Sequence, residues 1–322
     1  MKKNSLSNLQ LLFARSVGAE FFVNDARFQA SPALPLALRA ERFVVDGVSC
    51  YVAGHGPALL LLHSVNAAAS AAEMRPVFDH FNSTRTVFAI DLPGYGFSDR
   101  SDRAYTPRVM TDAIHKIAGE IRLRCGDAPI DAIALSLGCE FLVRAATENP
   151  TQWGRLALVS PTGLDARTAQ RAPREGTRFN AALHAALSVP LWTRALFDAL
   201  TRPSVVRYFL ERSWGSKNID ERAWAYAVKT AREPGARFAP FHFLAGGLFS
   251  TDIKTLYGRL KHPVWLSHGT RGEFTDFTGK SALQAANDWK VSVFDTGALP
   301  HFEEPREFFA AFNRFLENRA FN

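Results

Sequence analysis

The chain has 322 residues, of which 47% are hydrophobic and 21% are charged, and this composition supports one large folded domain with a full core. No apolar run approaches the roughly 20 residues that span a bilayer. Polar residues also interrupt the apolar stretch after the basic start, which disfavours a signal peptide and stable membrane insertion. The net charge is +7, but no long basic block and no nucleic-acid motif occurs, so we expect no nucleic-acid partner.

The three cysteines, Cys50, Cys125 and Cys139, form no CxxC pair. A low, odd cysteine count argues against a disulfide framework or a zinc site and fits the reducing cytoplasm, which is the location we expect. No cluster of metal ligands and no phosphate-binding glycine loop stands out. The sequence therefore predicts neither a metal nor an organic cofactor.

Residues 1–40 are expected to form a helical extension before the main domain. A β-hairpin follows, with strands at 42–45 and 48–53 that turn through Asp46-Gly47, a dipeptide typical of tight turns. The apolar run at 58–62 predicts a strand buried on both faces. Similar runs lie at 86–90, 130–135 and 156–160, and helical segments lie between them at about 70–82, 107–125 and 137–148.

The pattern changes after residue 164. Residues 165–250 read as helical and aromatic-rich, whereas strands resume at 264–267 and 291–295 and a last helix lies at 305–317. We therefore expect one α/β core formed by residues 41–164 and 251–322, with 165–250 as a helical cap insertion. The fold class is α/β, with a mostly parallel twisted sheet of about eight strands and helices on both faces.

A sharp turn is predicted at Ser136, between the strand 130–135 and the following helix. Ala134 and Gly138 stand two positions on either side, and small residues there let the strand fold tightly onto the helix. The residue at the apex is then held in strained backbone geometry with its side chain exposed at the end of the sheet. A serine at such a turn is a candidate nucleophile.

Three further landmarks accompany this turn. They are the leucine-rich strand that ends in His63, the motif Asp91-Leu-Pro-Gly-Tyr-Gly-Phe-Ser98, and the segment Leu299-Pro-His-Phe-Glu-Glu-Pro305. With them the chain resembles the α/β-hydrolase superfamily, specifically its members with a helical cap, over about residues 40–165 and 255–320. Asp91, Gly94, Gly96 and Ser98 are expected to shape a turn beside the site, without a chemical role.

The resemblance implies a Ser–acid–His order of catalytic residues, in which Ser136 is the nucleophile. His301, the only histidine after the last predicted strand, is then the expected general base. The chain departs here from the usual G-H-x-P-H-x-E-x-P pattern, because Ala298 stands where the first histidine belongs. His301 is either a base reached through a shifted loop or a structural residue beside an incomplete triad.

The acid is expected after the strand at 264–267, where relatives carry G-x-x-D and this chain has Gly269-Thr-Arg-Gly272. Glu273 and Asp276 lie just beyond and are the two candidates, with Glu273 preferred; Asp165 is a third, weaker one. Either carboxylate could orient the imidazole if the loop takes another route. The alternative for both is an ordinary solvated loop carboxylate.

The oxyanion hole is expected to use the N–H of Leu137 and an N–H from the loop after His63. That loop reads Ser64-Val65-Asn66, with Ser64 in place of the usual glycine. Ser64 and Val65 are the candidate donors, and Asn66 could add an amide toward the substrate. His63 itself is expected to brace the loop.

The aromatic insertion is expected to form a pocket for a small-molecule substrate, with Trp192, Trp214 and Phe241 as candidate lining residues. Many of these aromatics will instead pack the core of the cap. Arg178 and Arg194 could bind a substrate carboxylate, although solvated surface positions are the usual fate of arginine.

The leading hypothesis is a serine hydrolase that cleaves an apolar ester, thioester or ketone-adjacent C–C bond through an acyl-enzyme on Ser136. One alternative is a binding protein that kept the fold and lost turnover, and another is a lyase or cofactor-free oxygenase on the same fold. A haloalkane dehalogenase is disfavoured because its nucleophile would be aspartate. The sequence leaves open whether the chain forms a homodimer.

Overall fold

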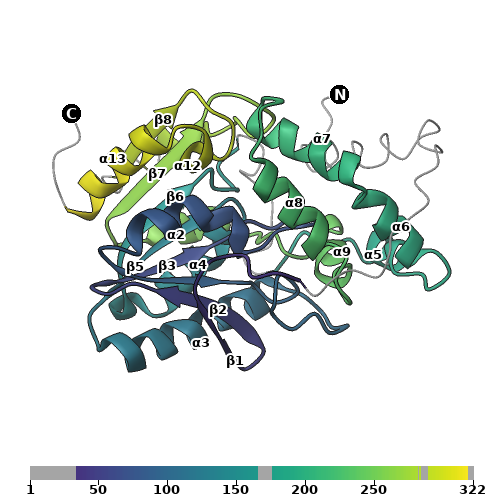
Figure 1. Ribbon diagram of the computed structural model, residues 1–322, viewed down its shortest axis with the longest axis horizontal. Helices are drawn as coiled ribbons and strands as arrows, with labels where there is room; N and C mark the ends of the chain where they lie inside the picture. The colour runs from purple at the N-terminus through teal and green to yellow at the C-terminus, as the bar shows by residue number, and fades with distance from the viewer. Residues whose placement is uncertain (1–33, 166–175, 282, 284–288, 318–322) are drawn as a thin grey trace.

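The computed structural model describes residues 34–165, 176–281, 283 and 289–317, which form a central sheet with helices on both faces (Figure 1). The strands are β1 (Glu41–Val45), β2 (Val48–Ala53), β3 (Ala58–Leu62), β4 (Thr86–Ile90), β5 (Ile130–Leu135), β6 (Trp153–Val159), β7 (Val264–Gly269) and β8 (Lys290–Phe294). Their order is β1-β2-β4-β3-β5-β6-β7-β8, and only β1–β2 and β2–β4 pair antiparallel. The predicted fold class is confirmed.

The first two strands form the predicted hairpin. Asp46 and Gly47 both have positive φ, at 47° and 80°. Such a pair matches the right-handed twist of the strands it joins, which explains why Asp-Gly is favoured there. The register pairs Val45 with Val48 directly across the turn.

The buried strand β3 explains why its sequence contains four consecutive leucines. Leu60 and Leu62 enter a core on the side of α3 and α4, whereas Leu59 and Leu61 enter a second core on the side of α2 and α13. Because successive side chains of a strand point to opposite faces, a strand covered on both faces is apolar throughout. All four leucines are completely buried.

The core helices are η1 (Ala71–Met74), α2 (Arg75–Phe81), α3 (Pro107–Cys125), α4 (Gly138–Glu148), η2 (Pro150–Gln152), α10 (Ile253–Arg259), α12 (Pro300–Glu303) and α13 (Pro305–Leu316). Those at 71–81, 107–125, 138–148 and 305–316 follow the predicted segments, whereas η2, α10 and α12 were not predicted. The bounds of α3 have a local cause, because the Thr106 side chain accepts a hydrogen bond from Val109 N–H at its start. At its end Gly126 takes φ 86°, which stops the helix.

Five helices lie between β6 and β7, in the part of the chain expected to form the cap. They are α5 (Ala181–Leu187), α6 (Thr193–Leu200), α7 (Pro203–Trp214), α8 (Glu221–Thr230) and α9 (Phe238–Leu244). In Figure 1 they lie together beside the sheet. Of the expected N-terminal helical extension, residues 34–40 form no helix and residues 1–33 lie outside the described part.

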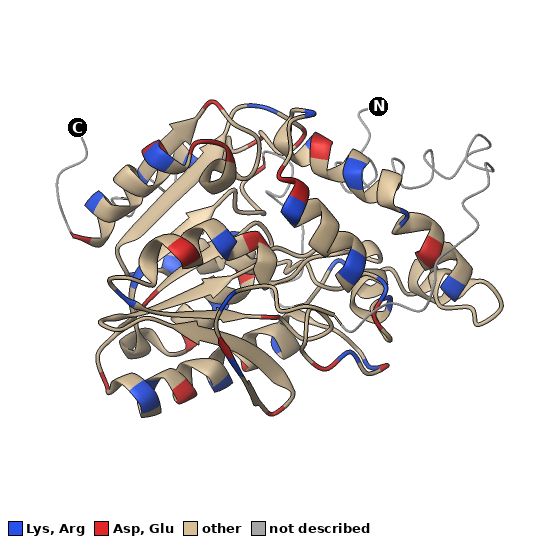
Figure 2. Cartoon of the chain, viewed as in Figure 1, with Lys and Arg blue, Asp and Glu red and all other residues tan. Residues whose placement is uncertain are grey.

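Charge is interspersed over the molecule. Along α3 basic and acidic positions alternate, and Figure 2 shows both signs on most visible helices. Within the described residues, no helix has both the length and the apolar character needed to cross a membrane. The parallel strands β3, β5, β6, β7 and β8 end at one edge of the sheet, where ligand sites of open α/β sheets are found.

Candidate active site

The turn at Ser136 has the strained geometry that the sequence predicts. Ser136 follows directly on β5, has φ 53°, and lies two residues before α4 begins. Its N–H donates to Val159 O at 2.8 Å, which ties the turn to the neighbouring strand β6. A left-handed backbone at a non-glycine residue costs about 1–3 kcal/mol and is retained mainly at functional sites.

Gly138 explains why the second flanking residue must be small. A Cβ built on Gly138 would lie 2.4 Å from His63 O, a backbone atom that has no room to move. Absence of a side chain therefore lets α4 start directly against the end of β3. This contact brings the loop after β3 beside the serine turn.

Two backbone donors are free at this junction. No hydrogen bond within the described part of the chain engages the N–H of Leu137 or of Val65. Ser64 differs from the expectation, because its N–H donates to Glu73 Oε2 at 2.8 Å. The structure thus leaves Leu137 and Val65 as candidate oxyanion donors and corrects the assignment of the Ser64 N–H.

Glu73 is a site residue that the sequence analysis missed. Besides Ser64, its carboxylate accepts from Asn66 Nδ2 at 2.9 Å, so the predicted substrate contact of Asn66 is used inside the loop. Burial raises the pKa of Glu73 above its usual value. The available signal was a single carboxylate within the otherwise apolar turn η1, directly after the oxyanion loop.

His63 and the motif at 91–98 have the structural roles expected of them. His63 Nδ1 donates to Ser64 O at 2.5 Å and its Nε2 accepts from Leu92 N–H at 2.9 Å. Burial lowers its pKa to about 4, so the ring is neutral and braces the loop. Asp91 receives N–H bonds from Ala71 at 2.8 Å and from Phe97 at 2.9 Å, which fixes the turn.

No hydrogen bond joins His301 to Ser136 in the described part of the chain. His301 Nε2 instead donates to the backbone oxygen of Glu73 at 2.8 Å. Nδ1 is buried and has no partner, and burial lowers the pKa of the ring to about 4. His301 is therefore a neutral imidazole with one unpaired acceptor nitrogen beside the oxyanion loop.

The expected base and acid positions meet the end of α7 in a backbone contact that we call the α7 seam (212–215 against 271–272 and 297–298). Ala298 N–H donates to Ser213 O at 2.8 Å. A Cβ on Gly297 would lie 2.3 Å from Ser213 O, and one on Gly272 would lie 2.6 Å from Arg212 O. The seam therefore fills the space that side chains at these loop positions would need.

Neither acid candidate is shown beside His301. Glu273 forms an ion pair with Arg212 of α7, and Asp276 accepts from Thr278 N–H at 3.3 Å and from Thr278 Oγ1 at 2.9 Å. Glu273 thus reinforces the α7 seam, and Asp276 caps its own loop. Both roles are the ordinary ones for loop carboxylates, so the preference for Glu273 as the acid finds no support in these contacts.

The comparisons with known proteins agree with this geometry. The sequence model of the Alpha/beta hydrolase family matches residues 59–312. The chain belongs to this family. Curated relatives include the pimeloyl-[acyl-carrier protein] methyl ester esterase of Xylella fastidiosa strain 9a5c, 28% identical over 109 residues, which are 34% of this chain and 38% of that protein. The match thus spans well under half of that relative's length.

Solved structures share the fold. A serine hydrolase involved in carbazole degradation (CarC) has TM-score 0.67 and 16% identity over 87% of this chain and 99% of its own. The meta-cleavage product hydrolase CumD from Pseudomonas fluorescens IP01 has TM-score 0.66 and 15% identity over 87% and 98%. Carboxylesterase CesB from Bacillus subtilis has TM-score 0.64 and 16% identity over 88% and 93%. Family and fold together support the prediction of a hydrolase.

The three aromatic residues expected to line a substrate pocket have different surroundings in this α/β hydrolase. Phe241 is 1% exposed and packs edge-on against Phe197 inside the core. Trp214 belongs to the α7 seam and packs against Phe302. Trp192 is 47% exposed, with its Nε1–H bonded to Ala186 O. These contacts give Phe241 and Trp214 packing roles, and their assignment as pocket residues stays a prediction.

A second buried carboxylate, Glu140, lies one turn after Ser136 in α4. It accepts from Thr162 Oγ1 at 2.5 Å and from Ser250 N–H at 2.9 Å. These two partners stand where the chain leaves the core for the helical insertion and where it returns. Burial raises the pKa of Glu140 to about 7. Glu140 therefore ties both ends of the insertion to the helix that follows the serine.

Proposed function

We propose that this chain is a serine hydrolase that cleaves an ester, thioester or ketone-adjacent C–C bond of a small molecule through an acyl-enzyme on Ser136. The observation that carries the proposal is the positive φ of Ser136 at the β5–α4 turn. A strained serine at this exact point of an α/β-hydrolase sheet is the arrangement that exposes a nucleophilic hydroxyl.

In the proposed reaction Ser136 Oγ attacks the substrate carbonyl carbon while its proton passes to a base. Leu137 and Val65 N–H groups stabilise the oxyanion that forms. Collapse breaks the bond to the leaving group, which takes the proton, and water then attacks the acyl-enzyme to release the acid and free Ser136. His301 is the proposed base, since Nδ1 is the one ring nitrogen left to accept a proton while Nε2 bonds Glu73.

The relatives support this class of reaction. Their names include a methyl ester esterase, a carboxylesterase and a meta-cleavage product hydrolase. We extend to this chain only the common element, cleavage next to a carbonyl group by an activated serine. The proposal includes two further expectations. The helical insertion covers the site, with Trp192 on its outer side, and the chain forms a homodimer.

A second candidate function is a binding protein that retains the fold without turnover. The α7 seam favours it, because Gly272, at the usual acid position, has Arg212 O against it. Ala298, at the usual base position, has no basic side chain and donates its N–H to Ser213 O. Under this alternative the loop donors of Leu137 and Val65 would bind a carbonyl or carboxylate ligand.

The test is covalent labelling with a fluorophosphonate, followed by intact-mass measurement and peptide mapping. Such a probe needs an activated serine beside oxyanion donors and requires no knowledge of the substrate. A single adduct on Ser136, absent in Ser136→Ala, is expected. Ser160→Ala is the matched control, because Ser160 also follows a strand with positive φ, at 47°. No adduct on protein with an intact thermal transition overturns the hydrolase and leaves the binding protein.

A further inference from the structure

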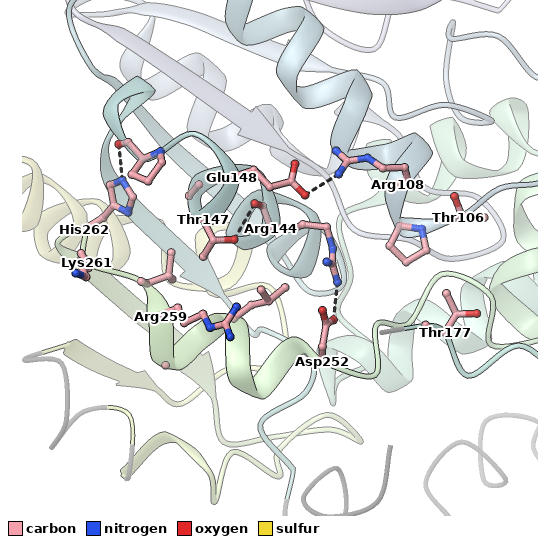
Figure 3. Close-up of a pocket in the computed structure, with 17 residues that line it drawn as sticks. Thr106, Arg108, Arg144, Thr147, Glu148, Thr177, Asp252, Arg259, Lys261 and His262 are labelled. Carbon is pink, nitrogen blue, oxygen red and sulfur yellow. Dashed lines mark hydrogen bonds and ion pairs between the residues drawn. The ribbon is translucent and has the colours of Figure 1, made fainter. Parts of the chain in front are cut away.

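A cavity of about 1160 Å³ lies away from Ser136, on the side of the sheet covered by α3 and α4 (Figure 3). Its walls come from the start of α3, the end of α4, and α10 with the segment that leads to β7. Helix α4 connects the two places, since it begins beside Ser136 and ends at Glu148 in the cavity wall. Eleven helical residues span about 16 Å, so the cavity is separate from the serine site.

The cavity has an excess of positive charge. Four basic side chains line it, namely Arg108, Arg144, Arg259 and Lys261. Only two carboxylates, Glu148 and Asp252, line it as well. Both carboxylates are already paired. Arg108 contacts Glu148 at 2.6 Å, and Arg144 contacts Asp252 at 2.5 Å.

Two of the four cations have no such partner. No ion pair within the described part of the chain involves Arg259 or Lys261, although both are close in sequence to Asp252. In Figure 3 Arg259 extends into the space beneath Thr147 and beside the Arg144–Asp252 pair, and Lys261 lies next to His262 at the edge. Arg259 thus carries unpaired charge into the cavity, whose net lining charge is +2 from four cations and two anions.

Buried polar atoms of the same wall also lack partners. His262 Nε2 donates to Pro150 O at 2.9 Å, but His262 Nδ1 is buried without a hydrogen bond, as is Arg144 Nε. Buried polar groups in folded proteins are nearly always hydrogen-bonded to protein, water or ligand. Arg144 Nε, His262 Nδ1 and the side chains of Arg259 and Lys261 are thus polar groups of this wall that no described protein group engages.

We propose that this cavity binds a soluble small molecule through a phosphate or diphosphate group. Arg259 presents the planar fork of donors that matches phosphate oxygens in pairs, and Lys261 adds a point charge. Arg144 Nε–H, which is buried without a partner in the same wall, is a third donor. The start of α3 at Thr106–Arg108 adds the positive end of a 19-residue helix to the same wall.

A multiply charged phosphate fits better than a single carboxylate. Two unpaired cations and a third donor exceed what one carboxylate can satisfy, whereas a phosphate carries up to two charges and at least three accepting oxygens. Nucleic acid is a poorer match, because its affinity comes from a row of phosphate contacts along a surface. In this chain the unpaired cations are only two, Arg259 and Lys261, and they line a cavity instead of a row along a surface.

The experiment is calorimetric titration of the full chain with inorganic pyrophosphate, inorganic phosphate and acetate, at constant ionic strength set with chloride. Saturable binding is expected, tighter for pyrophosphate. Arg259→Gln should weaken it at least tenfold and Lys261→Gln several-fold, with unchanged melting temperature. Arg306→Gln is the matched control, because Arg306 is an exposed arginine of α13, on the opposite side of the sheet.

Three outcomes overturn the proposal: no saturable heat at millimolar pyrophosphate, the same loss of affinity in Arg306→Gln, or equal affinity for acetate. The first two would make the cations ordinary solvated surface charge, and the third would remove the preference for phosphate. The result does not depend on the hydrolase proposal, because fluorophosphonate labelling of Ser136 should be the same in Arg259→Gln as in the unchanged protein.

Discussion

The two halves of the candidate active site are built in different ways. On the β3–β5 side, the strained Ser136 and the free donors of Leu137 and Val65 form the candidate nucleophile and oxyanion arrangement. On the β7–β8 side, Arg212 O lies against Gly272, the usual acid position, and Ser213 O accepts the N–H of Ala298, the usual base position. The nucleophile half depends on backbone geometry over a few neighbouring residues, whereas the other half depends on a contact with the inserted helices.

This difference shows that the two halves can change independently. The turn at Ser136 is preserved as long as Gly138 can pack against His63 O. The α7 seam is stabilised by Ala298 N–H on Ser213 O and by the Arg212–Glu273 ion pair, neither of which touches Ser136. A chain of this family can therefore keep the serine turn while the loops after β7 and β8 change. In the proposed mechanism, His301 then serves as the proton acceptor.

Removal of the nucleophile should have the largest effect. Ser136→Gly and Ser136→Ala should both lose the probe adduct and at least about 10³-fold of any hydrolase activity. The glycine variant should be more stable than the alanine variant by about 1 kcal/mol, because only glycine adopts φ 53° without strain. Chemical denaturation of the two variants measures this; equal stability would show that the turn is not strained.

Restoration of a carboxylate at the usual acid position should destabilise the protein. Gly272→Asp combines φ 86° with a Cβ 2.6 Å from Arg212 O, so we expect a loss of about 3 kcal/mol and no gain in activity. Gly126→Asp is the matched control, since Gly126 has the same φ of 86° in open space and should lose about 1–3 kcal/mol from backbone strain alone, so any additional loss in Gly272→Asp reports the clash with Arg212 O. A stable, more active Gly272→Asp protein would show that the α7 seam opens.

Sequence reasoning was accurate where the determinants are local. The hairpin at Asp46-Gly47, the buried leucines of β3 and the bounds of α3 each depend on neighbouring residues, and all were predicted. It missed Glu73 and Glu140, whose partners are set by chain packing: Glu140 bonds Ser250, 110 positions away. His301 bonds the backbone of Glu73 across 228 positions, and no spacing rule along the chain contains that contact.

The buried Glu140 should make stability fall as the pH rises. Its carboxyl stays protonated in the folded chain up to about pH 7 but ionises near its ordinary value of 4.5 when unfolded. Unfolding between these values releases a proton, so the free energy of unfolding should decrease from pH 4.5 to 7 by about 3 kcal/mol. Glu140→Gln should remove most of this decrease, and the exposed Glu307→Gln should leave it unchanged. Urea unfolding at pH 5 and pH 7.5 measures both.

The smallest effect should come from Glu73, which joins the two halves of the site. Its two carboxylate oxygens face two donors, Ser64 N–H and Asn66 Nδ2. Glutamine has only one accepting oxygen, so Glu73→Gln would turn an NH₂ group toward a donor and loosen the loop that positions Val65 N–H. The rate of fluorophosphonate labelling should fall about tenfold, in line with partial loss of oxyanion stabilisation.

The direction of this change separates two physical roles of Glu73. A slower rate means that the carboxylate matters chiefly as an acceptor that orders the loop. A faster rate would contradict the prediction and would mean that its negative charge opposes the developing oxyanion more than its hydrogen bonds help. Asn66→Asp is the control for loop order, because it replaces the donor Nδ2 with a second carboxylate facing Glu73 and should slow labelling under either role.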